Sequence, residues 1–203
     1  MITIIDYGMG NLKSIYNMLK HLGIDSNISN NLGEIKQSDK IILPGVGAFD
    51  NAMKNINSMG LKTILDTKVY ADKIPVLGIC LGMQLLTEQS EEGYLKGLGY
   101  IKGETIKFSF PKENNLKIPH MGWNSVSFLK ESLLTREMYG EHRFYFVHSY
   151  HVVCKDPSDS LCKTFHGYDF TSAFSHNNIY GVQFHPEKSH KFGMKLFKNF
   201  AEL

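Results

Sequence analysis

The chain has 203 residues, of which 42% are hydrophobic and 21% charged, and its formal net charge is +2. This composition is ordinary for a globular protein and argues against a disordered chain. The small net charge and the dispersed lysines and arginines point to neither a nucleic-acid nor a membrane partner. The length predicts a single domain covering residues 1–203.

The first half of the chain alternates predicted strands with predicted helices. Apolar runs indicate the strands, apolar residues at helical spacing indicate the helices, and glycines mark the turns. In chain order we expect a strand at 1–5, a helix capped by Asn11 and stopped by Gly23, a strand at 40–43, helices at about 50–56 and 61–70, a strand at 74–79, and a helix after Cys80. This order predicts an α/β, flavodoxin-like fold whose mostly parallel sheet carries helices on both faces.

The second half is richer in strands. Short β-type runs occur within 100–129 and 143–183, a brief helical stretch is expected at 132–139, and an amphipathic helix at about 191–203 closes the chain. In parallel sheets, ligands bind outside the carboxyl ends of the strands. The loops at 6–11, 44–49 and 80–84 all follow predicted strands, so we expect the site where they converge.

The N-terminal stretch MITIIDYGMG lacks the charged flank, long apolar run and cleavage site of a signal peptide. No segment approaches the roughly 20 apolar residues that a membrane-spanning helix needs. Cys80, Cys154 and Cys162 form no CxxC pair, which suits a reducing compartment. We therefore expect a cytoplasmic protein, with Cys154 and Cys162 as small buried hydrophobic residues.

The stretch GICLGMQ places Cys80 between two glycines, at a turn from strand to helix. Glycines allow the sharp backbone turn that pushes the central side chain into a site, as in the nucleophile elbow of hydrolases. The following helix start favours the thiolate form of cysteine. Although most cysteines are simply buried, this setting favours Cys80 as a nucleophile.

A nucleophile needs a base and a group that orients the base. In GVQFHPEKS, His185 and Glu187 are two residues apart, so their side chains lie on the same side of an extended segment. They could complete a Cys-His-Glu triad with Cys80. Alone, the pair would be two surface residues at a strand end, but together with the elbow the catalytic interpretation is favoured.

Two further interpretations of the sequence are weaker. His148 and His151 lie three apart in a predicted strand, which would place them on opposite faces, so we expect no metal site. The loop PGVG at 44–47 is followed by no P-loop Lys-Ser/Thr, which argues against phosphate binding. Its exposed backbone N–H groups, together with the amide of Leu81, could form an oxyanion hole instead. We expect no cofactor.

PGVGAF, GICLGMQ and GVQFHPEKS together resemble the three signatures of class I (triad) glutamine amidotransferases, in the same order and with matching spacing. Three further motifs, DYGMGNL, PHMGWN and YFVHSY, are similar to those of the glutaminase subunits of imidazole glycerol phosphate synthases. The similarity extends from the first strand to the last helix. It implies the fold of this family and the hydrolysis of L-glutamine to glutamate and ammonia.

The resemblance also implies roles for individual residues. Cys80 would attack the glutamine amide, His185 would protonate the departing ammonia, and Glu187 would orient His185. The positions matched to other roles are Val46 and Leu81 for the oxyanion hole, Gly47, Gln84, Glu92, His148 and Ser149 for glutamine binding, and Asn11, Met121, Trp123, Tyr145 and Lys188 for a partner interface. In this family the 45–46 peptide is thought to reorient before its amide points inward.

The implied partner is a (β/α)8-barrel cyclase subunit, joined in a heterodimer, which uses the ammonia to make imidazole glycerol phosphate and AICAR in histidine biosynthesis. An alternative is a paralogous subunit that supplies ammonia for amidation of a surface-polysaccharide sugar. The sequence could also encode a different Cys-His hydrolase of this fold, such as a γ-glutamyl hydrolase, or a docking module without catalysis. Gln84, Glu92 and PHMGWN disfavour the hydrolase, and the intact Cys80, His185 and Glu187 disfavour the docking module.

Overall fold

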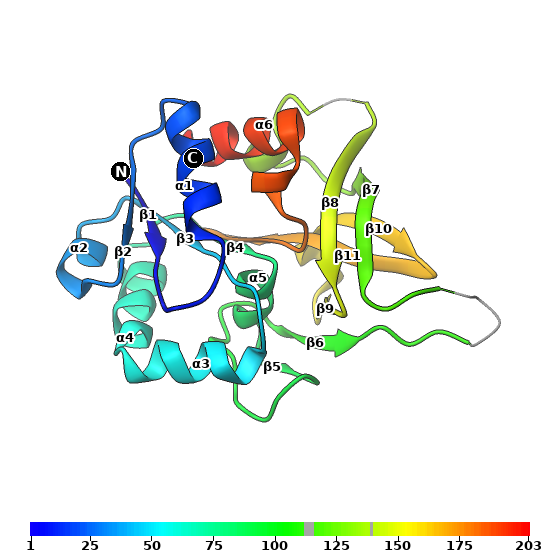
Figure 1. The fold of residues 1–203 in the computed structure, drawn as a ribbon, viewed down its shortest axis with the longest axis horizontal. Helices are drawn as coiled ribbons and strands as arrows, with labels where there is room; N and C mark the ends of the chain where they lie inside the picture. Colours follow the sequence, from blue (N-terminus) through cyan, green and yellow to red (C-terminus); the bar gives the residue numbers. More distant parts are fainter. Residues whose placement is uncertain (112–115, 139) are drawn as a thin grey trace.

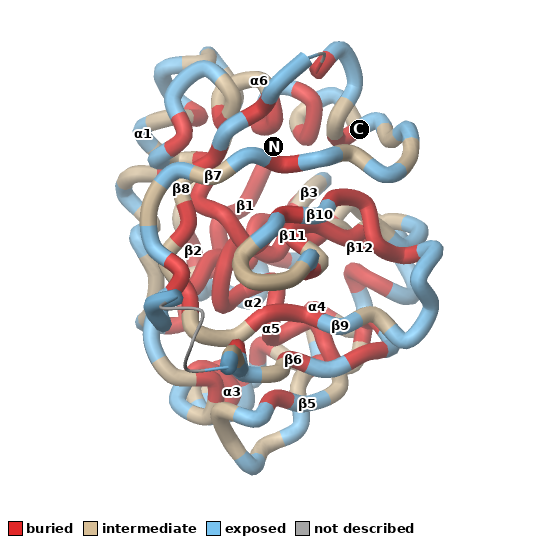
Figure 2. Tube along the Cα trace, turned by 90° about the vertical axis from the view of Figure 1, so that its right-hand side faces the viewer, coloured by how far each residue is buried: buried red, intermediate tan, exposed pale blue. Residues whose placement is uncertain are grey.

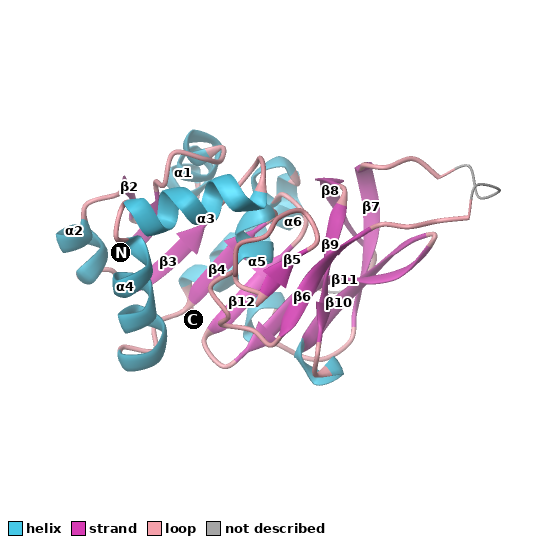
Figure 3. Cartoon of the chain, turned by 90° about the horizontal axis from the view of Figure 1, so that it is seen from below, coloured by secondary structure: helices cyan, strands magenta, loops and turns pink. Residues whose placement is uncertain are grey.

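The computed structural model describes residues 1–111, 116–138 and 140–203. Within these residues, strands join into one twelve-stranded network whose main path runs β2-β1-β3-β4-β12-β11-β10-β7-β8. The first five strands of this path are parallel: β2 (Ser26–Ser29), β1 (Ile2–Ile5), β3 (Lys40–Leu43), β4 (Val76–Ile79) and β12 (Ile179–Val182). Figure 3 shows β3, β4 and β12 side by side between the helices.

Helices cover both faces of the parallel part of the sheet (Figure 1). On one face, α1 (Leu12–His21) and α6 (His190–Ala201) pack over Ile4, Ile42 and Ile79. On the other, α2 (Leu32–Lys36), α3 (Phe49–Ser58), α4 (Leu61–Asp66) and α5 (Leu81–Leu85) pack over Ile5 and Leu43. Because side chains alternate along a strand, adjacent residues such as Ile4 and Ile5 enter different cores. Figure 2 shows the buried residues concentrated in these central strands.

The second half extends the sheet with mostly antiparallel strands. These are β5 (Gln89–Ser90), β6 (Gly103–Lys107), β7 (His120–Phe128), β8 (His142–His148), β9 (Tyr150–Cys154), β10 (Ser160–His166) and β11 (Tyr168–His176). Short turns of 3-10 helix lie at Leu133–Thr135, Pro157–Asp159 and Pro186–Lys188. The last of these turns begins four residues after the end of the parallel strand β12, and it carries Glu187.

The α/β class, the parallel sheet and the β-rich second half are confirmed. Several local predictions were wrong. Strand β2 and helix α2 were not predicted, because their short polar sequences show little periodicity. The expected helix at 61–70 changes at Thr67 into a π-helical turn that ends at Ala71. The stretch expected to be helical at 132–139 forms only the 3-10 turn at Leu133–Thr135, and Tyr139 lies outside the described residues.

Asn11 occupies the N-cap position of α1, but its side chain accepts no capping hydrogen bond. Its backbone, with φ of −91° and ψ of 63°, departs from the extended conformation in which a capping side chain reaches back to the first-turn amides. None of the helices in the described part of the chain is long and apolar enough to cross a membrane.

Candidate active site

Cys80 sits at the sharp turn between β4 and α5, as expected. Its φ is +55°, a left-handed conformation that is strained for a residue other than glycine. The turn packs so tightly that a Cβ on Gly82 would lie 1.8 Å from the carbonyl oxygen of Leu43. The Cys80 amide donates to the carbonyl of Val182 at 2.8 Å, which ties the turn to β12. The glycines therefore permit a backbone shape that holds the sulfur at the end of the sheet.

His185 and Glu187 follow β12, the strand next to β4. The Nδ1 of His185 lies 2.8 Å from Oε1 of Glu187, and both side chains are only 2% exposed. Burial lowers the pKa of His185, but the Cys80 sulfur and the Glu187 carboxylate outweigh it and raise that pKa well above its usual range. This environment favours the protonated, imidazolium form of His185.

The other nitrogen of His185, Nε2, is buried and has no hydrogen-bond partner among the described residues. Cys80 makes two contacts through its sulfur, with the carbonyl of Val147 at 3.9 Å and the side-chain amide of Gln183 at 3.7 Å. The Nδ1 contact with Glu187 leaves Nε2 as the nitrogen that can exchange a proton within the site.

A cavity of about 350 Å³ opens at Cys80. It collects all seven residues that the family resemblance assigned to the oxyanion hole and to glutamine binding: Val46, Gly47, Leu81, Gln84, Glu92, His148 and Ser149. Pro119, Val147 and Tyr150 complete its lining. These residues come from five separate segments of the chain, so the fold brings the predicted site together.

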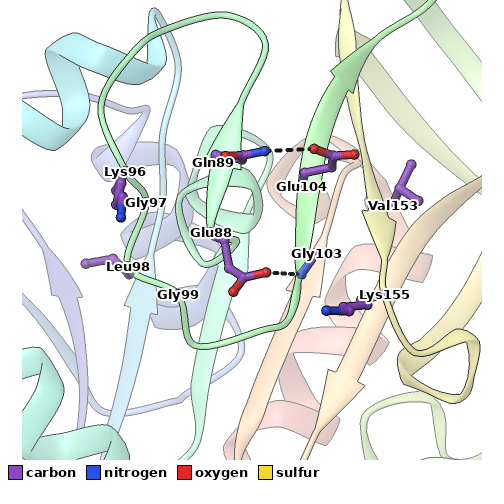
Figure 4. A pocket seen from close by; sticks show the side chains of 10 residues that line it. All are labelled: Glu88, Gln89, Lys96, Gly97, Leu98, Gly99, Gly103, Glu104, Val153 and Lys155. Carbon is purple, nitrogen blue, oxygen red and sulfur yellow. Dashed lines mark hydrogen bonds between the residues drawn. The ribbon is translucent and has the colours of Figure 1, made fainter.

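A larger cavity, about 610 Å³, lies elsewhere, around β5 and β6 (Figure 4). Four of its lining residues are hydrogen-bonded in pairs: Glu88 accepts from the Gly103 amide at 3.2 Å, and Gln89 donates to Glu104 at 3.0 Å. Cys80 and His185 are not among the residues that line it. The chemistry of the side chains, and not cavity size, therefore selects the smaller cavity as the candidate active site.

The loop after β3 lies against the turn at Cys80. A Cβ on Gly45 would come within 2.5 Å of the Tyr7 hydroxyl and 2.9 Å of the Leu81 Cβ, so only glycine fits there. The buried Tyr7 hydroxyl donates to the carbonyl of Pro44. Tyr7 thereby fixes the start of the loop, while Val46 beyond it is exposed.

Glu92 is anchored to the start of helix α3. Its Oε2 accepts from the Phe49 amide at 2.9 Å, and Asp50 accepts from the amides of Tyr94 and Leu95 at 3.0 to 3.1 Å. Amides in the first turn of a helix have no partner within the helix, so a carboxylate satisfies one of them here. The loop that carries Glu92 is thus held against the cavity.

His148 belongs to a chain of hydrogen bonds between buried histidines. Its Nδ1 donates to the carbonyl of Tyr150 at 2.7 Å, which leaves its Nε2 to accept from Nδ1 of His120 at 3.0 Å. His120 in turn accepts from Asn124 at 3.0 Å. Burial lowers the pKa of His148 well below its usual range, and burial together with His166 lowers the pKa of His120 to about 4. Both rings are neutral near pH 7.

The expectation that His148 and His151 face opposite ways was wrong. The strand is interrupted at Ser149, between β8 and β9, which shifts the alternation by one residue. Both rings therefore contact Phe108, at centroid distances of 5.2 and 4.7 Å. Even so, the residues that the structure describes contain no group of three or more His, Cys, Asp or Glu side chains able to hold a metal ion.

Three of the five residues assigned to a partner interface share one exposed face of β7 and β8, which we call the β7–β8 face. Trp123 pairs across the strands with Tyr145, and Met121 is 63% exposed. Lys188 lies 5.5 Å above the Tyr145 ring, and Trp123 stacks on His190 at 5.5 Å. Asn11 is exposed at the start of α1, which contacts the turn at Pro186–Lys188.

Sequence reasoning missed four residues around the site. Tyr7 supports the loop after β3, His120 supports His148, and Gln183 contacts the Cys80 sulfur. The Ser189 hydroxyl donates to the His185 carbonyl at 2.6 Å and accepts from the Tyr145 amide at 3.0 Å. All four lie inside the family-like motifs, so the motifs themselves were the only available signal.

Comparison with known proteins agrees with this geometry. The family model described as "Glutamine amidotransferase class-I" matches residues 3–203. The chain therefore belongs to the class-I glutamine amidotransferase family. Solved structures share its fold: one described as glutamine amidotransferase has a TM-score of 0.76 at 15% identity and covers 100% of this chain and 98% of its own. The structure of PurLQS from Thermotoga maritima has a TM-score of 0.73 at 15% identity, covering 99% and 97%.

Within the family, the chain is similar to subunits named HisH. It is 56% identical to "Imidazole glycerol phosphate synthase subunit HisH 2" of Methanococcus maripaludis, over 100% of this chain and 99% of that protein. It is 48% identical to the subunit of the same name from Pseudomonas aeruginosa, over the full length of both. The subunit HisH of Bdellovibrio bacteriovorus is 47% identical, again over the full length of both.

Proposed function

We propose that this protein is the glutaminase subunit of an imidazole glycerol phosphate synthase and that it releases ammonia from L-glutamine for histidine biosynthesis. One observation carries the proposal: the fold gathers Cys80, His185 and Glu187 at one end of neighbouring strands, beside a cavity lined by every residue matched to glutamine binding. The names of the full-length relatives supply the pathway.

In the proposed reaction, the Cys80 thiolate attacks the side-chain amide carbon of glutamine. The amides of Val46 and Leu81 stabilise the oxyanion, and His185 gives its proton to the departing nitrogen, which leaves as ammonia. Water, deprotonated by His185, then attacks the thioester, releases glutamate and restores the thiol. Glu187 keeps the His185 ring oriented throughout, because its carboxylate holds Nδ1. Gly47, Gln84, Glu92, His148 and Ser149 hold the amino-acid end of glutamine.

The β7–β8 face is the proposed docking surface for the partner, a (β/α)8-barrel cyclase. Met121 and Trp123 supply exposed apolar area, and Val147 on the same strand pair contacts the Cys80 sulfur through its carbonyl. A partner seated there would cover the cavity and receive ammonia directly. Buried aromatic anchors carry much of the energy of such interfaces, which suits Trp123.

The decisive measurement is glutamate release by the purified chain, first by itself and then with the cyclase and its nucleotide ligand. We expect strong activation of glutamate release in the complete mixture. We also expect Cys80→Ala to lose hydrolysis by several orders of magnitude. Appreciable turnover by Cys80→Ala would refute the mechanism. Silence with the histidine cyclase but activity with a sugar-amidating synthase would instead support the paralogous role in polysaccharide synthesis.

A further inference from the structure

Gln183 is fully buried and contacts two residues that line the candidate glutamine cavity, Cys80 and Gln84. Its exposed fraction is 0%, and it directly follows β12, two residues before His185. Its Nε2 lies 3.7 Å from the Cys80 sulfur, and its Oε1 accepts from the side-chain amide of Gln84 at 3.0 Å. A buried amide side chain is stable when its NH₂ group faces acceptors and its oxygen faces donors. These two contacts therefore fix the orientation of the Gln183 amide.

A backbone carbonyl determines which atoms of Gln84 and Gln183 donate hydrogen bonds and which accept them. The carbonyl of Tyr150 can only accept, and it lies 3.1 Å from the Gln84 amide, so Gln84 must present its Nε2 there. The second hydrogen of the same Nε2 then points at Gln183, which must present its oxygen. Gln183 is left with its NH₂ group facing the sulfur. A flipped Gln183 would place two NH₂ groups against each other.

We propose that Gln183 is a positioning residue of the glutaminase: its side-chain NH₂ donates a hydrogen bond to the Cys80 sulfur and stabilises the thiolate before glutamine is attacked. The proposed mechanism gives this donor a purpose. When the proton passes from sulfur to His185, the sulfur becomes negative beside the Val147 carbonyl, whose oxygen repels it at 3.9 Å. A hydrogen bond to a charged group offsets such repulsion.

The ionisable groups around the sulfur are few. Tyr7 is buried nearby, with its pKa raised by burial and then by Cys80, so it is neutral. His185, held by Glu187, is the proton acceptor, while His148 and Glu92 line the same cavity. None of these groups is an uncharged side chain that donates a hydrogen bond to the Cys80 sulfur. Gln183 is the residue to which we assign this role.

The test measures the thiolate directly. Cys80 in the intact chain is alkylated with iodoacetamide across a range of pH, and the rate is followed by mass spectrometry of its peptide. Cys154 and Cys162 react little, because burial raises the pKa of Cys154 to about 12 and that of Cys162 further. The variants are Gln183→Met, which removes the donor at similar volume, and Gln183→Glu, which keeps an acceptor for Gln84.

We expect the midpoint of the alkylation profile to rise by about one pH unit in Gln183→Met and by more in Gln183→Glu, where a carboxylate replaces the donor. Alkylation below both midpoints should slow about tenfold, and kcat with glutamine should fall by about the same factor while KM changes less than about twofold. Gln37→Glu, an exposed substitution of the same chemistry at the end of α2, is the matched control and should leave the profile unchanged.

Melting temperatures identify a variant that fails to fold, and in that case the other variant decides the test. Midpoints that stay at the wild-type value in a folded variant would overturn the inference, whatever happens to turnover. Because alkylation needs neither glutamine nor a partner, it tests the hydrogen bond separately from turnover. A shifted midpoint in a chain that hydrolyses no glutamine even with the cyclase and its nucleotide ligand would leave the hydrogen bond standing and refute the proposed function instead.

Discussion

The buried histidines predict that the fold weakens in mild acid. His120 and His151 are 5% and 3% exposed, and burial lowers the pKa of each to about 4 from a reference of 6.5. Below pH 6.5 the unfolded chain binds protons that the folded chain does not, so the free energy of unfolding falls as the pH falls. The contribution is fully present above pH 6.5 and is lost as the pH approaches 4. Between pH 7 and 5 each histidine should remove about 2 kcal/mol.

Urea unfolding at several pH values measures this loss. Other groups titrate as well, and His185, whose pKa is raised, gains stability in acid and opposes the trend. The measurement therefore compares the free energy of unfolding of wild type with that of His151→Phe at each pH. Between pH 7 and 5 the variant should lose about 2 kcal/mol less of this free energy than wild type does. His21→Gln, on the exposed side of α1, should behave as wild type. A His151→Phe protein with the full wild-type loss would refute the assignment of a neutral buried His151.

Three further predictions follow from the site. Gly82→Ala should lower the melting temperature sharply, at a cost of at least about 2 kcal/mol, because its Cβ would overlap the Leu43 carbonyl; a normal melting curve would contradict the tight turn. Glu187→Gln should lower kcat at least about tenfold with folding retained, and unchanged steady-state kinetics would show that His185 needs no carboxylate. Trp123→Ala should weaken cyclase binding, measured by titration calorimetry, more than it affects melting; the reverse result would make Trp123 a core residue.

The sequence predicted the parallel core well, because buried strands such as β1 and β4 are continuous apolar runs flanked by glycines. It failed at β2, a half-buried edge strand whose short polar sequence leaves no apolar signature. The strand break at Ser149 was also invisible, since YFVHSYHVV reads as one continuous strand. In the site, motif residues could be placed at the right edge of the sheet. Contacts that depend on tertiary distance, such as Gln183 on Cys80, could not.

The position of β12 affects how the protein is made. This strand pairs with β4 on one side and with β11 on the other, so it alone joins the parallel half of the sheet to the antiparallel half along the main path. It also follows β4 and β11 in the chain, so it is synthesised after Cys80 and shortly before His185. A nascent chain thus exposes the thiol of Cys80 long before its base exists. Completion of the sheet and assembly of the proposed triad become the same event, and a chain shortened before residue 179 loses both at once.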